Sequence, residues 1–416
     1  MRYQTRVVET EIKERLAAVG AVVIEGPKAC GKTETARRFA ASEVLLDVDE
    51  NARRAIEADP RLVLEGEVPR LLDEWQLEPA IWNDVRRAID DRGKPGQFIL
   101  TGSALPQDDV SRHTGAGRLT RVRMRPMTLF ETGHSSGEVS LGNLLHGIPS
   151  GSSEPGLTVP QLAELIAIGG WPGNLDLGVE QKLRAVRDYL EEIRRVDIRR
   201  VDGTGRDPNK VGRLLRSLAR NVATYAGFTT LATDTAGPDG ELKRHTVSEY
   251  LGALERLLVV ENQPPWAPHL RSKSRLRSSD KLHFVDPSLA VAALRANPDR
   301  LLEDMKLLGF LFESLVIRDL RAYAQAADAS VYQYRDNTGL EIDAIVETAA
   351  GGWAAFEIKL GAGRIDQGVA SLLRFAERVD PKRSGRPATL AVVTGTGYGY
   401  VRDDGVCVIP VGALGP

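Results

Sequence analysis

The 416-residue chain contains few cysteines: only Cys30 and Cys407. A disulfide-stapled secreted scaffold or a cysteine-rich zinc module needs several cysteines at close spacing, so their scarcity argues against both classes. Two isolated thiols are typical of a protein kept in a reducing compartment. We therefore expect a cytoplasmic protein.

The sequence also lacks a long apolar run and an excess of charge of either sign. No stretch approaches the roughly 18–20 apolar residues of a membrane-spanning helix, and the first residues lack the apolar core of a signal peptide. Lys and Arg number 55 and Asp and Glu 57, a net charge of −2. This balance excludes a globally basic nucleic-acid coat and confines any contact with nucleic acid to a local patch. At roughly 100–200 residues per domain, the length predicts two to four domains.

The first 132 residues alternate short apolar runs with helical patterns. The runs lie at 21–24, 44–46, 71–72 and 98–100, and helices are expected at 9–19 and 33–41. Short buried runs separated by helices are typical of a parallel sheet with helices on both faces. We therefore predict an α/β fold.

A glycine-rich turn follows the first apolar run and matches the pattern G-x-x-x-x-G-K-[ST]. Its residues, with Glu34 after them, form the predicted nucleotide-binding set: Gly26, Pro27, Lys28, Ala29, Cys30, Gly31, Lys32, Thr33 and Glu34. Glycines let successive amides point at phosphate oxygens, Lys32 neutralises the β- and γ-phosphates, and Thr33 offers a hydroxyl to Mg²⁺. The motif predicts a RecA-like P-loop core that binds ATP and ADP with Mg²⁺. A glycine turn with a surface lysine is the alternative.

Polar side chains end two further predicted strands. Asp73 and Glu74 follow the run at 71–72, where Asp73 would hold Mg²⁺ and Glu74 would orient and deprotonate the attacking water. Thr101 and Ser103 follow the run at 98–100 and are candidates to touch the γ-phosphate or the water. A solvated helix start and an ordinary turn are the respective alternatives. Arg118 is the first choice for an arginine finger, in its own subunit or across an interface, ahead of Arg121, Arg123 and Arg125.

The middle of the chain divides into two predicted units. Residues 133–209 read as a linker rich in Gly, Ser and Pro followed by a helical lid. Residues 210–300 have the element order of a winged helix-turn-helix, with a capping box at Thr246 and Glu249 and a basic wing at 271–281. The wing cations are Arg271, Lys273, Arg275, Arg277 and Lys281. A solvated or partner-facing wing is the alternative to DNA contact, which Arg244 and His245 would extend to base edges.

The last unit, 301–416, is predicted as helix, three strands, helix and two strands. Along 340–346 a period of two places Glu341 and Asp343 on one face, and along 356–360 it places Glu357 and Lys359 together. Glu313 on the preceding helix would add a third acid. Carboxylates at one point suit Mg²⁺ or Mn²⁺, beside which Lys359 would help phosphodiester hydrolysis. A solvated polar sheet face is the alternative.

Two resemblances extend these readings. The segments LTGSA (100–104), GAGR (115–118), RPMTLFE (125–131) and GGWPG (169–173) resemble prokaryotic AAA+ ATPases that carry a C-terminal domain of unknown function. The resemblance implies that Asp73 and Glu74 are the Walker B pair and that 101–103 is sensor 1. Pro69 and Arg70 depart from the apolar pattern there, which predicts a short or edge strand.

The C-terminal unit resembles the restriction-endonuclease-like PD-(D/E)xK superfamily. The matching positions are Asp343, Glu357 and Lys359, with Glu313 and Gln367 as accessory positions. The proline of the superfamily motif is absent, since Ile342 precedes Asp343. The resemblance implies a nuclease-like fold, with or without cleavage.

Three functions remain open from the sequence. The first is an ATPase coupled to a DNA-associated winged helix and a nuclease-like module. The second is a nucleotide-gated regulatory or protein-interaction ATPase whose nuclease-like domain does not cleave, and a homo-oligomer is compatible with both. The third is a small-molecule kinase.

Overall fold

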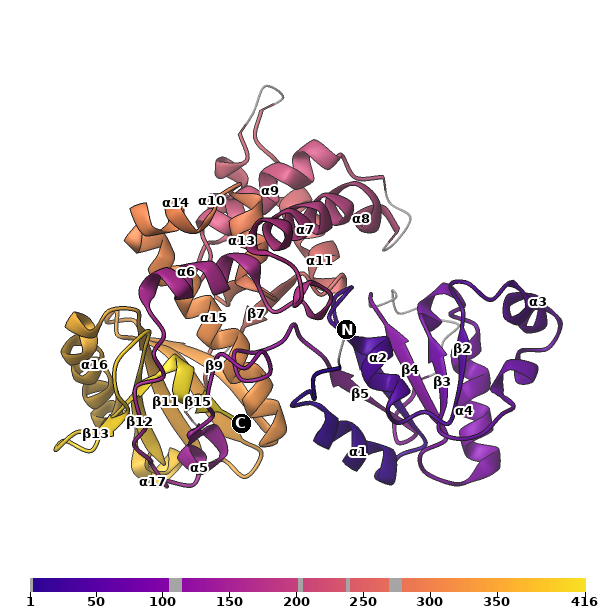
Figure 1. The fold of residues 1–416 in the computed structure, drawn as a ribbon, viewed down its shortest axis with the longest axis horizontal. Coiled ribbons are helices and arrows are strands. Elements are labelled where there is room, and N and C mark those ends of the chain that lie inside the picture. Colours follow the sequence, from indigo (N-terminus) through magenta and orange to yellow (C-terminus); the bar gives the residue numbers. More distant parts are fainter. Residues whose placement is uncertain (1–2, 105–113, 201–204, 237–239, 269–278) are drawn as a thin grey trace.

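The computed structural model describes residues 3–104, 114–200, 205–236, 240–268 and 279–416. An N-terminal sheet and a C-terminal sheet lie at opposite ends of the molecule, and a block of helices lies between and above them (Figure 1). No helix in the described ranges is long and apolar enough to cross a membrane.

The N-terminal sheet has five parallel strands in the order β2-β3-β4-β1-β5. Its strands are β1 (Ala21–Glu25), β2 (Ser42–Leu45), β3 (Arg70–Asp73), β4 (Phe98–Gly102) and β5 (Leu119–Arg123). Its helices are α1 (Glu9–Ala18), α2 (Lys32–Arg37), α3 (Glu50–Ala58) and α4 (Ile81–Arg92). The predicted parallel α/β architecture is confirmed. Helix α2 ends at Arg37, four residues before the predicted end.

Alternate residues of these strands pack into two separate apolar cores, one on each face of the sheet. Val22 and Ile24 pack with α1 and α2 on one face, whereas Ala21 and Val23 join α3 and α4 on the other. Strand β3 has four residues, as its polar start predicted. It is not an edge strand, because it lies between β2 and β4 and its last three residues are buried.

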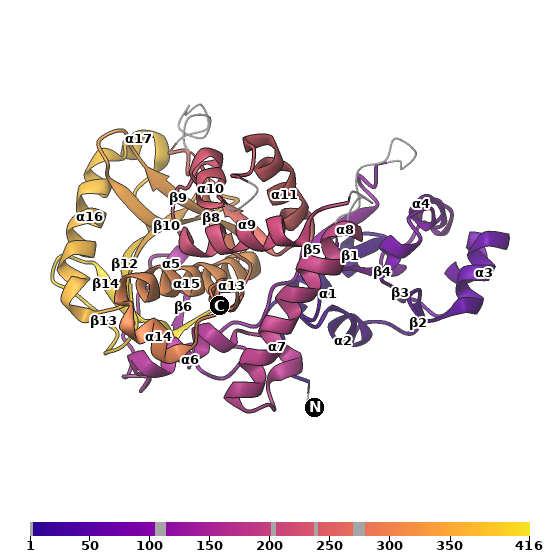
Figure 2. The ribbon, with the colours of Figure 1, turned by 90° about the horizontal axis from the view of Figure 1, so that it is seen from above.

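The helical block follows the N-terminal sheet. Its elements are α6 (Val159–Ile168), α7 (Val179–Glu192), a π-helical turn (Ile193–Asp197), α8 (Ile198–Arg200), α9 (Pro208–Arg220), α10 (Phe228–Asp234), α11 (Arg244–Arg256), β7 (Val260–Gln263), β8 (Lys281–Phe284), α13 (Pro287–Ala293) and α14 (Pro298–Glu303). Figure 2 shows α7 on the side of the block that faces the N-terminal sheet. The predicted capping box at Thr246 is wrong, because α11 begins two residues earlier and its N-cap, Lys243, makes no side-chain cap. Val247, Tyr250, Leu251 and Leu254 form a buried apolar face on α11.

The C-terminal sheet has six strands in the order β13-β14-β12-β11-β10-β9. The elements of this region are α15 (Met305–Ala326), β9 (Ala329–Arg335), β10 (Glu341–Thr348), β11 (Trp353–Lys359), α16 (Ile365–Arg378), α17 (Pro381–Ser384), β12 (Thr389–Thr394), β13 (Tyr400–Val401), β14 (Cys407–Pro410) and β15 (Leu414–Gly415). Strands β9, β10 and β11 are antiparallel neighbours, while β11, β12 and β14 run parallel. The order and type of the main elements agree with the prediction.

The segment predicted as a linker packs along the C-terminal sheet. It contains β6 (Val139–Ser140) and α5 (Leu141–Leu145), and β6 pairs with β15 at the end of the chain. Ser135 donates a hydrogen bond to the Leu414 carbonyl, and Thr389 donates one to the Leu144 carbonyl. These contacts fix the segment to the C-terminal sheet. The prediction of a flexible linker is therefore wrong for this segment.

One apolar core joins the helical block to the C-terminal sheet. It runs from Leu129 to Leu414 and includes α6, α7, α9, α11, α13 and α15. Helix α15 lies at its centre, with fourteen buried residues. A second core packs α16 against the other face of the sheet, around Trp266 and Trp353. A movement of α15 would therefore change the packing of both the helical block and the C-terminal sheet.

Candidate nucleotide site and a buried charge cluster

The phosphate-binding loop joins β1 to α2. Gly31 has φ 99°, a left-handed conformation, immediately before α2 begins at Lys32. A Cβ on Gly26 would lie 2.3 Å from the Met124 carbonyl oxygen, so this position requires glycine for close approach. Lys32 is 5% exposed and its ammonium donates to the Pro27 carbonyl at 2.9 Å, across the loop. The backbone curl and the lysine are thus placed as an anion-binding loop requires.

Three elements bring their polar ends together at Asp73. Thr33 from α2 donates to Asp73 Oδ1 at 2.9 Å, and Thr101 from β4 donates to the same oxygen. Burial raises the pKa of Asp73, and the two hydroxyls oppose that rise. Because β4 lies between β1 and β3, Thr101 stands between the phosphate loop and the acid pair. A hydroxyl oxygen and a carboxylate oxygen side by side form a hard-oxygen pair that suits Mg²⁺.

Glu74 sits beside this pair in a left-handed backbone conformation, with φ 55°. Such a conformation is uncommon for a residue other than glycine and is concentrated at functional sites. Its carboxylate accepts a hydrogen bond from Ser103 Oγ at 3.0 Å and another from the Gln76 amide. Ser103 is therefore an orienting partner of Glu74. Glu34 lies apart, exposed and paired with Arg37.

Two contacts of the phosphate loop were not anticipated from the sequence. Arg6 donates to the Cys30 carbonyl at 2.7 Å and pairs with Glu131 at 3.0 Å, which pins the loop to the N-terminal segment. Lys28 Nζ lies 2.6 Å from Asp197 Oδ1, in the π-helical turn. Both contacts join residues more than 20 positions apart, and no local pattern marks them.

The arginine candidates do not meet the phosphate loop. Arg118 precedes β5 at the end of the sheet where β1 begins, whereas the phosphate loop follows the other end of β1. Its carbonyl accepts from Ala21 N and its guanidinium pairs with Asp90 at 2.5 Å. An arginine finger within the same subunit is therefore excluded for Arg118, while one across an interface stays a prediction. Arg121 pairs with Glu25, and Arg125 pairs with Glu261 at 2.6 Å.

A second polar cluster lies where β10 and β11 diverge. Their ladder ends at Ala344 opposite Phe356, and a bulge in β10 between Ile342 and Ile345 turns two successive residues toward one side. The carboxylate of Asp343 accepts from Ile358 N at 2.9 Å and lies 3.1 Å from Lys359 Nζ. Lys359 also lies 2.5 Å from Glu357. The predicted gathering of Asp343, Glu357 and Lys359 is thus observed.

Lys281 completes the cluster, contrary to its predicted place in the wing. It is 3% exposed, and its ammonium lies 2.6 Å from Glu313 and 3.5 Å from Asp343. Burial raises the pKa of Glu313 to about 7, whereas Lys281 and Lys359 hold the pKa of Asp343 below its ordinary value against the effect of burial. A buried ammonium in this position cannot also contact DNA. The remaining wing cations, Arg271, Lys273, Arg275 and Arg277, lie outside the described residues.

The predicted second metal site is not supported. Across the described ranges, no group of three or more His, Cys, Asp or Glu side chains is arranged to hold a metal ion. The charge of the carboxylates at Glu313, Asp343 and Glu357 is instead balanced by two lysines. Gln367, the accessory position, is exposed in the first turn of α16.

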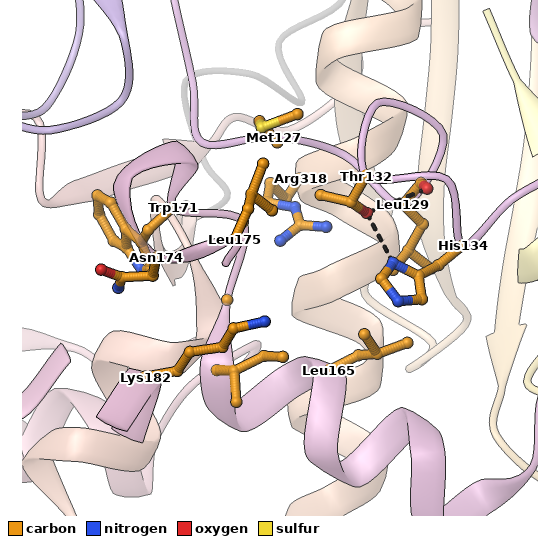
Figure 3. A pocket seen from close by; sticks show the side chains of 13 residues that line it. Met127, Leu129, Thr132, His134, Leu165, Trp171, Asn174, Leu175, Lys182 and Arg318 are labelled. Atoms are coloured by element: carbon orange, nitrogen blue, oxygen red, sulfur yellow. Dashed lines mark hydrogen bonds between the residues drawn. The ribbon is translucent and has the colours of Figure 1, made fainter. Parts of the chain in front are cut away.

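A small cavity near the GGWPG turn offers no competing substrate site. Met127, Trp171, Lys182 and Arg318 are among its lining residues (Figure 3). Its volume is about 30 Å³, the share of one water molecule in the liquid. A nucleotide would not fit.

Three family models match separate parts of the sequence. An AAA domain matches residues 19–133, and two domains of unknown function, DUF8612 and DUF4143, match residues 159–300 and 308–414. The N-terminal domain is that of a P-loop AAA-type ATPase, and the chain is an ATPase. The C-terminal match assigns no activity.

The other comparisons add little. No curated protein matches the sequence. Among solved structures, the Walker-type ATPase PABY2304 of Pyrococcus abyssi shares 14% sequence identity, with 71% of this chain and 99% of that chain covered. The TM-score of 0.41 is too low for that similarity to carry an argument.

Proposed function

We propose that the protein hydrolyses ATP in a Mg²⁺-dependent reaction at the loop 26–33, and that hydrolysis changes the position of the C-terminal domains. The observation that carries this proposal is the convergence of Thr33 and Thr101 on one carboxylate oxygen of Asp73. Thr33 and Asp73 would hold Mg²⁺, which when bound neutralises charge on the β- and γ-phosphates. Lys32 binds the same phosphates directly.

Glu74 is the proposed general base. Its carboxylate is fixed by Ser103 and Gln76, so its orientation is set before substrate arrives. In that position it would accept a proton from the water that attacks the γ-phosphorus. Ser103 and Thr101 are proposed as positioning residues.

Two sets of contacts support coupling between the ATPase domain and the rest of the chain. Lys28 in the phosphate loop pairs with Asp197 of the helical block. At the end of α15, Gln325 donates to Glu11 at 2.6 Å and to the Arg123 carbonyl at 2.9 Å. The same helix carries Glu313 of the buried charge cluster. A movement of α1 or β5 in the ATPase domain can thus reach the cluster through α15.

We further propose that the C-terminal module has a nuclease-like fold that does not cleave. The helix–three-strand–helix–strand order and the set Asp343, Glu357 and Lys359 support the fold. Lys281 favours the non-cleaving form, because its ammonium already lies between Glu313 and Asp343, where a divalent cation would be needed. Purified protein with Mn²⁺ should leave supercoiled DNA intact. Nicking by the wild type that Lys359→Ala abolishes would contradict this proposal.

DNA association through a winged helix is the least direct part of the proposal. The order α9, α10, α11, β7, β8 supports such a unit, and the two strands pair antiparallel. Arg244 and His245 are exposed at the start of α11. Phosphate release should change when duplex or single-stranded DNA is added at low salt. An unchanged rate at saturating DNA would contradict the coupling of hydrolysis to DNA.

A further inference from the structure

An arginine-lined cleft opens between α7, α9 and the end of α13. Its volume is about 630 Å³, within the usual range of ligand sites. Five arginines line it against two acids, Asp188 and Glu191. They are Arg187, Arg194, Arg213, Arg216 and Arg295. The cleft therefore carries a local excess of positive charge in a chain whose net charge is −2.

Two of these guanidinium groups have buried N–H groups without acceptors. Nε and Nη2 of Arg213, and Nε of Arg194, have no hydrogen-bond partner among the described residues. Nη2 of Arg194 donates a hydrogen bond to Glu191 at 2.6 Å. Leaving a buried charged donor unsatisfied is costly, and native proteins rarely do so without a functional reason. An acceptor that reached these donors would complete their hydrogen bonds, and the surrounding positive charge favours an anion in that role.

The backbone is adapted to hold Arg194 in this place. Gly212 lies in the interior of α9, where glycine is less favourable than alanine. A Cβ at this position would lie 2.9 Å from Arg194 Nη1 and 3.0 Å from its Cδ. The glycine lets the arginine side chain lie against α9 beside Arg213. The planar guanidinium groups of Arg194 and Arg213 can each donate two parallel hydrogen bonds, which matches the geometry of phosphate oxygens.

We propose that this cleft binds phosphate groups, supplied by a nucleic-acid strand or by a free polyphosphate. The site is separate from the ATP site. It lies on the same π-helical turn as Asp197, three residues after Arg194, and Asp197 holds Lys28 of the phosphate loop. Mid-helix π turns are frequent at functional sites. Occupancy of the cleft is therefore expected to alter ATP turnover through this turn.

The test measures binding in the absence of ATP, so it does not depend on the proposed hydrolysis. The probes are a fluorescent 30-nucleotide single strand, the corresponding duplex and inorganic triphosphate, each titrated at low and moderate salt. The variants are Arg213→Gln and Arg216→Gln. The control is Arg184→Gln, an exposed arginine of α7 that does not line the cleft and carries the same charge change.

The expected result is that at least one probe binds, and that Arg213→Gln weakens it about ten-fold while Arg184→Gln changes it less than two-fold. Arg216 is exposed, so its variant keeps the test valid if Arg213→Gln fails to fold. Which probe responds identifies the source of the phosphate. Lack of binding by all three probes, or equal binding by cleft and control variants, would overturn the proposal.

Discussion

In the proposed function, Lys32 and Glu74 have different tasks at one site, and single substitutions separate them. Lys32→Ala removes the charge that faces the phosphates, so ATP binding should weaken by about 10- to 100-fold, the effect of losing charge-assisted hydrogen bonds. Glu74→Gln keeps the size of the side chain and removes the base. Binding should persist while kcat falls by about 10²- to 10⁴-fold.

Calorimetry and phosphate release on the same preparations measure the two quantities. Arg37→Gln is a suitable control, because Arg37 is exposed at the end of α2 and pairs only with surface acids. If Glu74→Gln hydrolyses ATP at the wild-type rate, another group activates the water.

Lys281 is the internal counter-ion of Glu313 and Asp343, and its loss should be destabilising. Lys281→Gln leaves Glu313 and Asp343 buried without the ammonium that now lies between them. Breaking a buried ion pair from one side costs about 3–5 kcal/mol. Urea unfolding should show a loss of about that size, whereas exposed Lys243→Gln should lose less than about 0.5 kcal/mol. Equal losses would mean that the cluster does not depend on this lysine.

At the residue scale, local patterns predict partners that are close in sequence or share a strand period. Asp343, Glu357 and Lys359 follow from alternation along two neighbouring strands. Lys281 does not, because its pattern is that of an alternating basic ribbon and its partner Glu313 is 32 positions away. The same holds for Arg6, whose contact with the Cys30 carbonyl is set by tertiary packing.

The π-helical turn at 193–197 connects the helical block to the phosphate loop through the ion pair of Asp197 and Lys28. Asp197→Asn should free Lys28, which is partly exposed, to turn toward the bound phosphates of ATP. We expect the Kd for MgATP to fall about five-fold, equivalent to about 1 kcal/mol.

The effect should depend on Lys28. In a Lys28→Gln background, Asp197→Asn should leave the Kd for MgATP unchanged, because the ammonium that would turn toward phosphate is gone. An equal gain in both backgrounds would show that Asp197 acts through general repulsion alone. Fluorescent-nucleotide titration measures all four proteins.

At the element scale, periodicity predicts strands and helices well where one face is buried. Strand β10 begins and ends within two residues of the alternating stretch 340–346. The bulge in β10 could not be foreseen, because alternation continues through Ile342 and Ala344 while the chain gains one residue against β9. The start of α11 was misplaced because a Thr-x-x-Glu pattern also occurs inside helices.

The whole molecule is tied together at Glu261, which links three elements. Its carboxylate binds Arg125 of the ATPase domain at 2.6 Å and Arg321 of α15 at 3.5 Å. Burial alone would raise the pKa of Glu261, but the arginines lower it well below the ordinary value of 4.5. The folded state therefore holds the ionised form. Its stabilising contribution is fully present above about pH 4.5 and is lost as pH falls through the depressed pKa.

Glu261→Gln should accordingly destabilise the protein by about 2 kcal/mol at pH 7, since the group is only partly buried. The difference from wild type should narrow as the pH falls below about 4.5. Urea unfolding across that pH range measures the effect, with Glu192→Gln, an exposed position, as the control. A difference that stays constant with pH would contradict the assignment of the effect to this ion pair.

At the scale of the molecule, the sequence separates the two sheets correctly but not their attachments. The residues at 133–158 are rich in Gly, Ser and Pro, a composition shared by mobile linkers and by straps that lie along a surface. The pairing of β6 with β15 and the hydrogen bonds of Ser135 and Thr389 distinguish the two, and these contacts join residues more than 240 positions apart. The shared core around α15 likewise depends on contacts that no local window contains.

The central claim is that the loop 26–33 and the pair Asp73 and Glu74 form one magnesium-nucleotide pocket. The most direct measurement is calorimetric titration of the wild-type chain with ATP, with and without Mg²⁺. The account predicts saturable binding of one nucleotide per chain that is markedly tighter with Mg²⁺. Absence of binding heat with Mg²⁺ at several temperatures, or an affinity that Mg²⁺ leaves unchanged, would contradict it.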